Sequence, residues 1–275
     1  MQGKHVLITG GTAGIGRETA LGLARLGADV TLLGRDRAKA ERAASAIRTA
    51  TGNDAVWALA ADLADRNAVH QAAEEYRLRH KQLDVLFNNA GLFLPRRELT
   101  RDGQERTFAT VYLGHYLLTQ LLLDRLKAAE QGRILFVTCP PAQARVRFED
   151  LTLERGYSTL KAQFQAKGAL FLLMHELCYQ LSAAPVTVNC MLPGLMIRTE
   201  LLADMPFYMR LAVRLFGMSP AKAAEAQIWL ASAPELAGVT NRYFLGRVEK
   251  PLAGQIVDDE ASRKLWQLSQ ALTGI

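Results

Sequence analysis

Cysteine is scarce in this sequence: its 275 residues include three, Cys139, Cys178 and Cys190. An odd number at these spacings excludes both a disulfide scaffold and a cysteine-rich zinc site, so we expect no bound metal. The apolar run at 4–9 predicts a strand close to the first residue, and we therefore expect no targeting segment before the fold. Both features indicate a reducing compartment, and we expect the protein to be cytoplasmic.

Long apolar runs and blocks of like charge are also missing. No apolar stretch approaches the roughly 20 residues that a membrane-spanning helix needs. Basic residues exceed acidic ones by 33 to 27, which gives a net charge of +6. The arginines are nevertheless interleaved with acids, as in RDRAKAERAASAIR at 35–48, which is typical of a solvated helix face. We therefore expect neither a membrane span nor a nucleic-acid partner, because no basic patch supports one.

What the sequence does contain is a regular alternation of two patterns. Short apolar runs predict strands at 4–9, 29–33, 55–60, 83–87, 132–138 and 186–191. Segments with helical periodicity predict helices at about 14–26, 36–51, 65–80, 102–129 and 160–182. Short apolar strands separated by helices predict parallel β-α-β units that are covered on both faces. We therefore expect α/β architecture in a single domain over 1–275, with a Rossmann-type doubly wound parallel sheet of about seven strands.

The stretch at 195–220 differs in composition from the rest of the chain. It is apolar, rich in methionine and aromatic residues, and interrupted by Pro206 and Pro220. Two interpretations are open: a pair of short helices packed on the core, or a helical lid over a substrate. We favour the substrate lid, because ligands of open α/β sheets bind at the carboxyl ends of the strands.

A glycine-rich turn, TGGTAGIG at 9–16, follows the first predicted strand and opens the first predicted helix. Gly10, Gly14 and Gly16 permit a tight turn and let the backbone approach a pyrophosphate. The free N–H groups at the start of the helix attract the same negative charge. A glycine-rich turn alone is a weak signal, but its place between a strand and a helix favours a dinucleotide site over a plain turn.

The end of the second predicted strand indicates which dinucleotide is bound. An acidic residue there would accept hydrogen bonds from the ribose 2′-hydroxyl of NAD(H), but the chain has Gly34 followed by Arg35. A second arginine, Arg17, follows the glycine-rich turn, and a guanidinium can pair bidentately with a 2′-phosphate. This pattern favours NADP(H). In the alternative interpretation both arginines lie on the surface and Asp36 pairs with one of them.

Asp62 closes the third predicted strand, at the edge of the sheet where ligands bind. Its carboxylate could accept a hydrogen bond from the adenine amino group, or it could cap the N-terminus of the next helix. The two roles are compatible with each other.

Taken together, these motifs resemble those of the short-chain dehydrogenase/reductase superfamily. In chain order they are TGGTAGIG at 9–16, Asp62-Leu63, NNAG at 88–91 and Pro193-Gly194. Segments similar to its retinol-dehydrogenase-like branch lie at 113–126, 144–151 and 219–244. The resemblance covers nearly the whole chain and implies a fold that binds NADPH or NADP+. The implied cofactor-binding residues are Gly10, Thr12, Gly14, Ile15, Gly16, Arg17, Arg35, Asp62, Leu63, Asn89, Ala90, Gly91, Lys167, Pro193, Gly194 and Thr199.

The resemblance also implies four catalytic positions, which the family fills with asparagine, serine, tyrosine and lysine. In this chain they are Val111, Cys139, Gln163 and Lys167, so that only the lysine is retained. A tyrosine phenol has a pKa of about 10 and can release a proton, whereas a glutamine amide cannot. The chain therefore combines the family's cofactor motif with a degenerate catalytic tetrad. Lys167 lies either beside the nicotinamide ribose or, in the alternative interpretation, on an exposed helix face.

Tyr157 and Lys161 repeat the family's Y-x-x-x-K spacing six residues earlier. Six residues rotate a helical side chain by about 240°, which places it on another face. Gly156, just before it, predicts a loop or a helix start. Two interpretations remain, a substitute acid and a surface or lid tyrosine, and we favour the second.

Three functions fit this combination. The first is an NADPH-dependent ketoreductase in which a hydroxyl of the substrate stabilises the alkoxide. Polyphenolic aromatic polyketides carry such hydroxyls, and an apolar lid suits a flat polycyclic ketone; in this respect the chain is similar to the atypical ketoreductase of angucyclinone antibiotic biosynthesis. The second is a non-redox step in the same pocket, such as isomerisation, dehydration or cyclisation. The third is a non-catalytic regulator that binds NADP(H).

The apolar stripes of the predicted helices at 102–129 and 160–182 leave the oligomeric state open. They could belong to the core, or they could form the interface of a homodimer, as in many relatives. The other expected partner is a small apolar or aromatic ketone.

Overall fold

The computed structural model describes residues 1–194, 196–198, 213, 217–252 and 258–275. Its centre is one eight-stranded sheet in the order β3-β2-β1-β4-β5-β6-β7-β8. The strands are β1 His5–Thr9, β2 Asp29–Gly34, β3 Val56–Ala60, β4 Val85–Asn88, β5 Gly132–Val137, β6 Val186–Leu192, β7 Arg242–Leu245 and β8 Val248–Lys250. Strands β1 to β7 pair in parallel, which confirms the predicted α/β Rossmann-type fold.

The predicted number of about seven strands is wrong by one. The eighth strand, β8, pairs with β7 in the antiparallel direction and has three residues, all of them exposed. A strand that buries no side chain leaves no alternating apolar pattern in the sequence. The edge of the sheet was therefore the part that sequence periodicity could not define.

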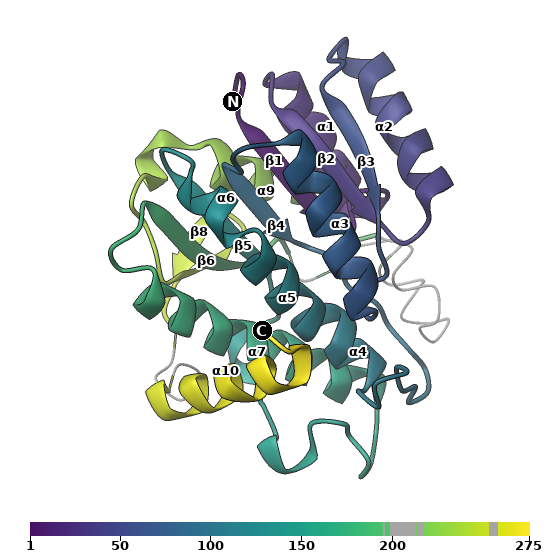
Figure 1. Ribbon diagram of the computed structural model, residues 1–275, viewed down its shortest axis with the longest axis vertical. Coiled ribbons are helices and arrows are strands. Elements are labelled where there is room, and N and C mark those ends of the chain that lie inside the picture. Colours follow the sequence, from purple (N-terminus) through teal and green to yellow (C-terminus); the bar gives the residue numbers. More distant parts are fainter. Residues whose placement is uncertain (195, 199–212, 214–216, 253–257) are drawn as a thin grey trace.

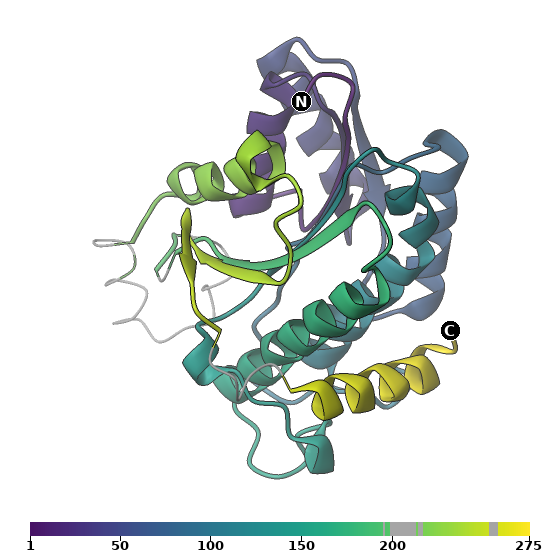
Figure 2. The same ribbon diagram turned by 90° about the vertical axis from the view of Figure 1, so that its left-hand side faces the viewer.

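Helices cover both faces of the sheet (Figures 1 and 2). They are α1 Gly14–Arg25, α2 Arg37–Thr51, α3 Arg66–Arg79, α4 Arg106–Phe108, α5 Gly114–Leu121, α6 Leu123–Lys127, α7 Thr159–Gln180, α9 Pro220–Ser232 and α10 Asp259–Thr273. Val6 and Ile8 of β1 pack with α1, α2 and α9, whereas Leu7 packs on the other face with α3, α5 and α7. Among the described helices, none is both long and apolar enough to cross a membrane.

The helix predicted at 102–129 is not continuous. It begins with α4, directly after Glu105, because the buried carboxylate of Glu105 accepts hydrogen bonds from the N–H groups of Thr107 and Phe108 at 2.9 and 2.8 Å. A π-helical turn at Ala109–Leu113 then leads into α5, and α6 follows as a separate short helix. Such turns interrupt the regular ladder of hydrogen bonds and often occur near functional sites.

The long helix α7 lies between the sheet and α10, which Figure 2 shows running beside it. Leu265 of α10 is buried in the same core as α7. The Tyr112 hydroxyl, from the π-helical turn, and the Ser269 hydroxyl of α10 lie 2.7 Å apart. Much of the apolar stripe predicted at 160–182 is therefore covered within the chain. The homodimer stays a prediction.

The predicted lid at 195–220 lies mostly outside the described residues, and so does Thr199. In the parts that are described, Ile197 and Met218 form an isolated parallel bridge. The N–H group of Arg198 donates to the Met218 carbonyl oxygen at 3.0 Å. The two ends of the stretch therefore meet shortly after β6.

Candidate active site

The carboxyl end of β1 turns into α1 through a loop that requires glycine. Gly10 and Gly14 have φ angles of +65° and +54°, in the left-handed region that glycine favours. A Cβ on Gly16 would meet the Gly10 carbonyl oxygen at 2.4 Å and the side-chain amide of Asn89 at 2.7 Å. Any side chain at these positions would strain or block the turn. The backbone N–H groups at the start of α1 are left to face an anion such as a pyrophosphate.

Beneath this turn, the Thr9 hydroxyl joins three segments of the chain. Its oxygen accepts hydrogen bonds from the backbone N–H groups of Asn89 and Ala90, both at 2.9 Å. The Nε2 atom of His115 lies 2.9 Å from the same oxygen. The other ring nitrogen, Nδ1, lies 2.8 Å from the Val111 carbonyl oxygen, which can only accept. The proton of the neutral ring is therefore on Nδ1, and the Thr9 hydroxyl donates to Nε2, which is closer to it than its other acceptor, the Phe87 carbonyl oxygen at 3.2 Å.

Burial keeps His115 in this neutral form. Its side chain is fully buried, and burial lowers its pKa to about 4, with a further contribution from the charge of Lys167. The ring therefore links Thr9 to the π-helical turn and does not carry a proton at neutral pH. Sequence reasoning missed this link, because Thr9 and His115 lie 106 residues apart in the chain.

A second buried chain of hydrogen bonds reaches the turn from the opposite face of the sheet. The Asn89 amide nitrogen donates to the Thr9 carbonyl oxygen at 2.9 Å. The Asn89 amide oxygen accepts from Gln227 of α9 at 3.1 Å, and the Thr19 hydroxyl of α1 donates to the Gln227 amide oxygen at 2.5 Å. Gln227 is fully buried. Its only sequence signal is a polar residue among the alanines and the leucine that form the buried face of α9, which identifies no partner.

Lys167 and Cys139 are neighbours at the carboxyl end of β5. Burial lowers the pKa of the Lys167 ammonium, and the Cys139 thiol nearby has the opposite effect. Burial raises the pKa of Cys139 to about 11, so the thiol stays protonated at neutral pH. No described residue forms a hydrogen bond with Lys167. Its free donors fit the hydroxyl groups of a ribose.

Gln163 stands one helical turn before Lys167 on α7, and its side chain is 3% exposed. Its amide nitrogen donates to the Leu92 carbonyl oxygen. Because that carbonyl can only accept, the amide oxygen must point the other way, and it has no partner among the described residues. This position therefore presents a buried hydrogen-bond acceptor and no proton that the site could use.

Tyr157 lies in the turn before α7, outside the helix that carries Lys167. Its hydroxyl donates to the Leu94 carbonyl oxygen at 3.0 Å, and the Thr159 hydroxyl donates to the same oxygen at 2.7 Å. Burial raises the pKa of Tyr157, and Glu105 adds to the effect. These two hydrogen bonds connect the start of α7 to the loop that follows the NNAG motif at 88–91.

The end of β2 has no room for a side chain at Gly34. A Cβ there would meet the Thr12 methyl carbon at 2.6 Å. Asp36 caps α2, where its carboxylate accepts from a backbone N–H group at 2.8 Å. Arg17 pairs with the carboxylate of the next residue at 3.2 Å, and the side chain of Arg35 is exposed. The alternative in which Asp36 pairs with one of these arginines is therefore not what the structure shows.

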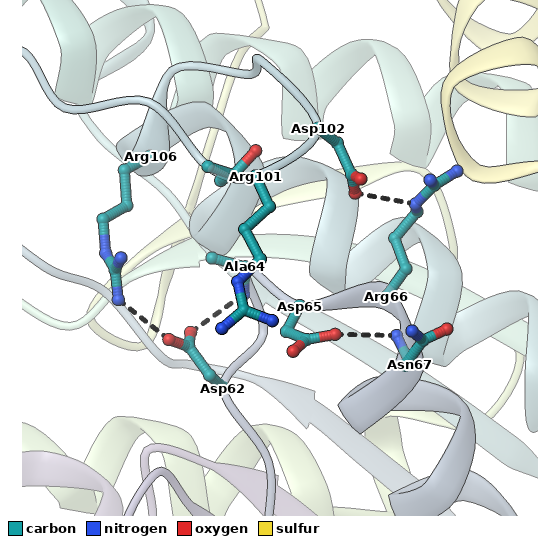
Figure 3. A pocket seen from close by; sticks show the side chains of 9 residues that line it. Asp62, Ala64, Asp65, Arg66, Asn67, Arg101, Asp102 and Arg106 are labelled. Carbon is teal, nitrogen blue, oxygen red and sulfur yellow. Dashed lines mark hydrogen bonds and ion pairs between the residues drawn. The ribbon is translucent and has the colours of Figure 1, made fainter.

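Asp62 sits at a charged corner where β3 leads towards α3 (Figure 3). Its carboxylate accepts from the Ala64 N–H group at 3.0 Å and from the Arg106 guanidinium at 2.8 Å. Asp65, and not Asp62, caps α3, by accepting from the Asn67 N–H group at 2.9 Å. The predicted capping role of Asp62 is thus wrong. A cavity of about 310 Å³ borders this corner and is lined mainly by charged side chains.

The remaining predicted residues also lie at this edge of the sheet. Asn89, Ala90 and Gly91 follow β4, Leu63 follows β3, Ile15 is in the first turn of α1, and Pro193 and Gly194 follow β6. The structure therefore gathers the described part of the predicted set around the carboxyl ends of the strands. The set fits a nicotinamide dinucleotide, because the turn is shaped by glycines and the Lys167 ammonium has free donors.

Comparison with known proteins agrees with this arrangement. The family model described as short chain dehydrogenase matches residues 4–206. Retinol dehydrogenase 14 of Homo sapiens is 36% identical over 296 residues, which cover 100% of this chain and 88% of that protein. Polyprenol dehydrogenase of Mus musculus is 38% identical over 283 residues, with 99% and 84% covered. The crystal structure of 3-ketoacyl-(acyl-carrier-protein) reductase from Brucella melitensis, complexed with NADH, has a TM-score of 0.70 at 26% identity and covers 89% of this chain and 96% of its own.

Proposed function

The chain belongs to the short chain dehydrogenase family, and we propose that it is an NADPH-dependent ketoreductase acting on an apolar aromatic ketone. The substrate class that we propose is an aromatic polyketide of the angucyclinone type. One combination supports the proposal: glycines shape the turn after β1 and Lys167 could contact a cofactor there, while Gln163 and Cys139 offer no group that releases a proton near neutral pH. We propose that the chain keeps the residues with which the family binds its cofactor and lacks the tyrosine that serves the family as an acid.

In this proposal the residues of the chain hold the cofactor and the substrate in position and do not supply the proton. Bound NADPH would supply the hydride that adds to the carbonyl carbon. The carbonyl oxygen needs a proton, which the Gln163 amide oxygen cannot give. We infer that a substrate hydroxyl, hydrogen-bonded to that oxygen, gives the proton and regains one from water. Positioning alone supports turnover, although the loss of a general acid typically costs about 10²–10⁴-fold in rate.

Support for NADP(H) comes from the end of β2. The contact between Gly34 and Thr12 leaves no space for the acidic side chain that would bind a ribose 2′-hydroxyl. Arg35 is exposed directly after the strand, and Arg17 lies in the first helix. The reductase from Brucella melitensis is complexed with NADH, so the choice of NADP(H) rests on Gly34 and these two arginines of this chain.

Support for an apolar substrate comes from the relatives. Their names refer to retinol and to polyprenol, which are both largely hydrocarbon molecules. The narrower class of hydroxylated polycyclic ketones is supported by the missing acid, since such a ketone carries its own hydroxyl proton close to the carbonyl oxygen. The predicted lid would cover such a ligand.

The same absence of an acid supports two other functions. A chain that docks NADP(H) could catalyse a non-redox isomerisation, dehydration or cyclisation in this pocket. It could also bind the dinucleotide without any catalysis and act as a regulator. The protonated Cys139 thiol and the Gln163 amide are compatible with either.

Two matched ketones distinguish these functions. The purified protein would be mixed with NADPH and a peri-hydroxylated quinone, or with the same quinone O-methylated at that hydroxyl, while NADPH absorbance and product mass are followed. We expect NADPH consumption with the hydroxylated ketone and a rate at least about 10²-fold lower with the methylated one. Equal rates would contradict the role of the substrate hydroxyl. Product formation without NADPH consumption would indicate a non-redox step, and tight NADPH binding without any product would indicate a regulator.

We further propose that the protein works in the cytoplasm. Its three cysteines are unpaired, and burial raises the pKa of each thiol. Buried free thiols are common in a reducing compartment.

A further inference from the structure

Two histidines and an aspartate meet at the edge of the sheet opposite the glycine-rich turn. His5 and Asp29 are the first residues of β1 and β2 and are paired in register, and His80 directly follows α3. The Asp29 carboxylate lies 3.5 Å from Nδ1 of His5 and 3.9 Å from Nδ1 of His80. One ligand atom from each of the three residues falls within 4.8 Å of the others. Three segments that are distant in sequence thus present imidazole and carboxylate groups to one point.

The polar atoms of this cluster are poorly satisfied within the described part of the chain. His80 is only 4% exposed, and its Nε2 atom has no hydrogen-bond partner there. Nδ1 of His5 and Oδ1 of Asp29 are also buried without a partner. Buried polar atoms are normally paired, because leaving one unpaired costs free energy. Nδ1 of His5 faces the Asp29 carboxylate at 3.5 Å and has no hydrogen-bond partner among the described residues, so it is available to a ligand.

We propose that His5, Asp29 and His80 bind one divalent transition-metal ion of the zinc class, with water at the fourth position. Two imidazoles and one carboxylate are a ligand set that suits zinc. Zinc lies about 2.0–2.2 Å from such ligands, so tetrahedral ligand atoms are about 3.3–3.5 Å apart. The separations of 3.5 and 3.9 Å measured from Asp29 are close to this value.

The electrostatics of the cluster are compatible with a cation. The His80 ring is buried, and its Nδ1 atom lies 3.9 Å from the Asp29 carboxylate, which brings negative charge into the cluster. A second carboxylate, Asp84, accepts from the His5 N–H group at 2.8 Å, and the Lys4 ammonium pairs with this carboxylate at 3.0 Å. The nearby Arg79 guanidinium is stacked on the ring of Trp57, with 4.4 Å to its centroid.

The site would act on stability and not on turnover. A metal there would join the amino ends of β1 and β2 to the end of α3, at the end of the strands away from the cradle. Its occupancy is therefore independent of the proposed reductase function. Sequence reasoning expected no metal because it looked for cysteine ligands, and these three residues share no motif.

The test uses the full chain, freed of metal by a chelator. Equilibrium dialysis against Zn²⁺ and visible absorption with Co²⁺ would measure binding, and thermal unfolding would measure its effect. We expect one ion per chain, a tetrahedral Co²⁺ spectrum, and a rise in melting temperature with Zn²⁺. Asp29→Asn and His5→Gln should each weaken Zn²⁺ binding by about 100-fold or more. Losing a residue that is only hydrogen-bonded to a metal ligand typically weakens metal binding by about 10–100-fold, and losing the ligand itself should cost more.

His175→Gln is the matched control, because His175 also pairs with an aspartate, Asp259, at 2.7 Å, but on the surface. It should bind Zn²⁺ like the unaltered chain. Circular dichroism would show whether each variant is folded. If a variant is unfolded, Zn²⁺ binding by the unaltered chain decides the test. The proposal is overturned if the folded, unaltered chain shows no saturable binding at micromolar Zn²⁺. It is also overturned if Asp29→Asn binds Zn²⁺ as tightly as His175→Gln does.

Discussion

Arg35 is the residue on which the choice of dinucleotide depends most. We expect Arg35→Ala to weaken NADPH binding by about tenfold, because a charge-assisted hydrogen bond to a phosphate would be lost. NADH binding should not change, since NADH has no 2′-phosphate. Fluorescence titration with both dinucleotides measures the two affinities, and Arg42→Ala, an exposed arginine on α2, serves as the control. Equal losses for NADPH and NADH would show that Arg35 acts on something other than the phosphate.

His115 predicts a pH dependence of stability. Its ordinary pKa is 6.5, and burial lowers it to about 4 in the folded chain. Between these values the unfolded chain binds a proton that the folded chain does not, so the free energy of unfolding falls as the pH drops from 6.5 towards 4. We expect His115→Gln to remove this part of the decline, as measured by urea unfolding at about pH 7.5 and about pH 5.

His80 has a similarly lowered pKa and contributes to the same window, so some of the decline should remain in the His115→Gln variant. His175→Gln, in which the altered ring is at the surface, should keep the full decline. If the free energy of unfolding fell with pH equally in the unaltered chain and in His115→Gln, the buried His115 ring would gain a proton as readily as an exposed ring.

At the scale of elements, α9 holds the NNAG segment through one side chain. Gln227→Leu would leave Asn89 and Thr19 without their buried partner, and we expect a loss of about 1–3 kcal/mol in the free energy of unfolding. NADPH binding should weaken as well, because Asn89 shapes the turn around Gly16. Urea unfolding and NADPH titration measure the two effects.

Gln180→Leu is the control for this change, since Gln180 is exposed and, within the described part of the chain, its side chain bonds only to Glu176 in its own helix. It should leave both measurements within experimental error. Full stability of Gln227→Leu would show that water or a rearranged side chain replaces the buried amide.

Sequence patterns predicted the elements well where local chemistry marks their ends. Asp36 and Ser158 are ordinary capping residues, and α2 and α7 begin directly after them, close to the predicted positions. The start of α4 was missed because its cap, Glu105, is an unusual capping residue. The glycine-rich turn was predicted because its glycines lie within eight residues of sequence, although Asn89, which packs against Gly16, is distant in the chain.

Contacts between distant segments could not be predicted from one sequence. Thr9 and His115, or Gln227 and Asn89, carry no motif that pairs them, and only the fold brings them together. The orientation of Gln163 was equally inaccessible, since it depends on the carbonyl group of Leu92. The sequence showed that this position is a glutamine, whereas only the structure showed that the Gln163 amide oxygen has no hydrogen-bond partner among the described residues.

At the scale of the whole molecule, the site is held from both faces of the sheet. His115 reaches the end of β1 from α5 on one face, and Gln227 reaches the neighbouring end of β4 from α9 on the other. Both attachments are neutral and buried, so they fix positions without supplying a proton. This arrangement is what we expect of a reductase that depends on placement and takes its proton from the substrate.

Turnover of Tyr157→Phe tests this account most directly. Tyr157 is the tyrosine that a motif search would select as the acid, yet its hydroxyl is bonded to the Leu94 carbonyl oxygen. We expect NADPH consumption with a peri-hydroxylated quinone to stay within about threefold of the unaltered chain, because only a loop contact is lost. Lys167→Met, in contrast, should weaken NADPH binding. A loss of about 10²-fold or more in Tyr157→Phe, with NADPH binding intact, would identify a phenol as the proton source and contradict the account.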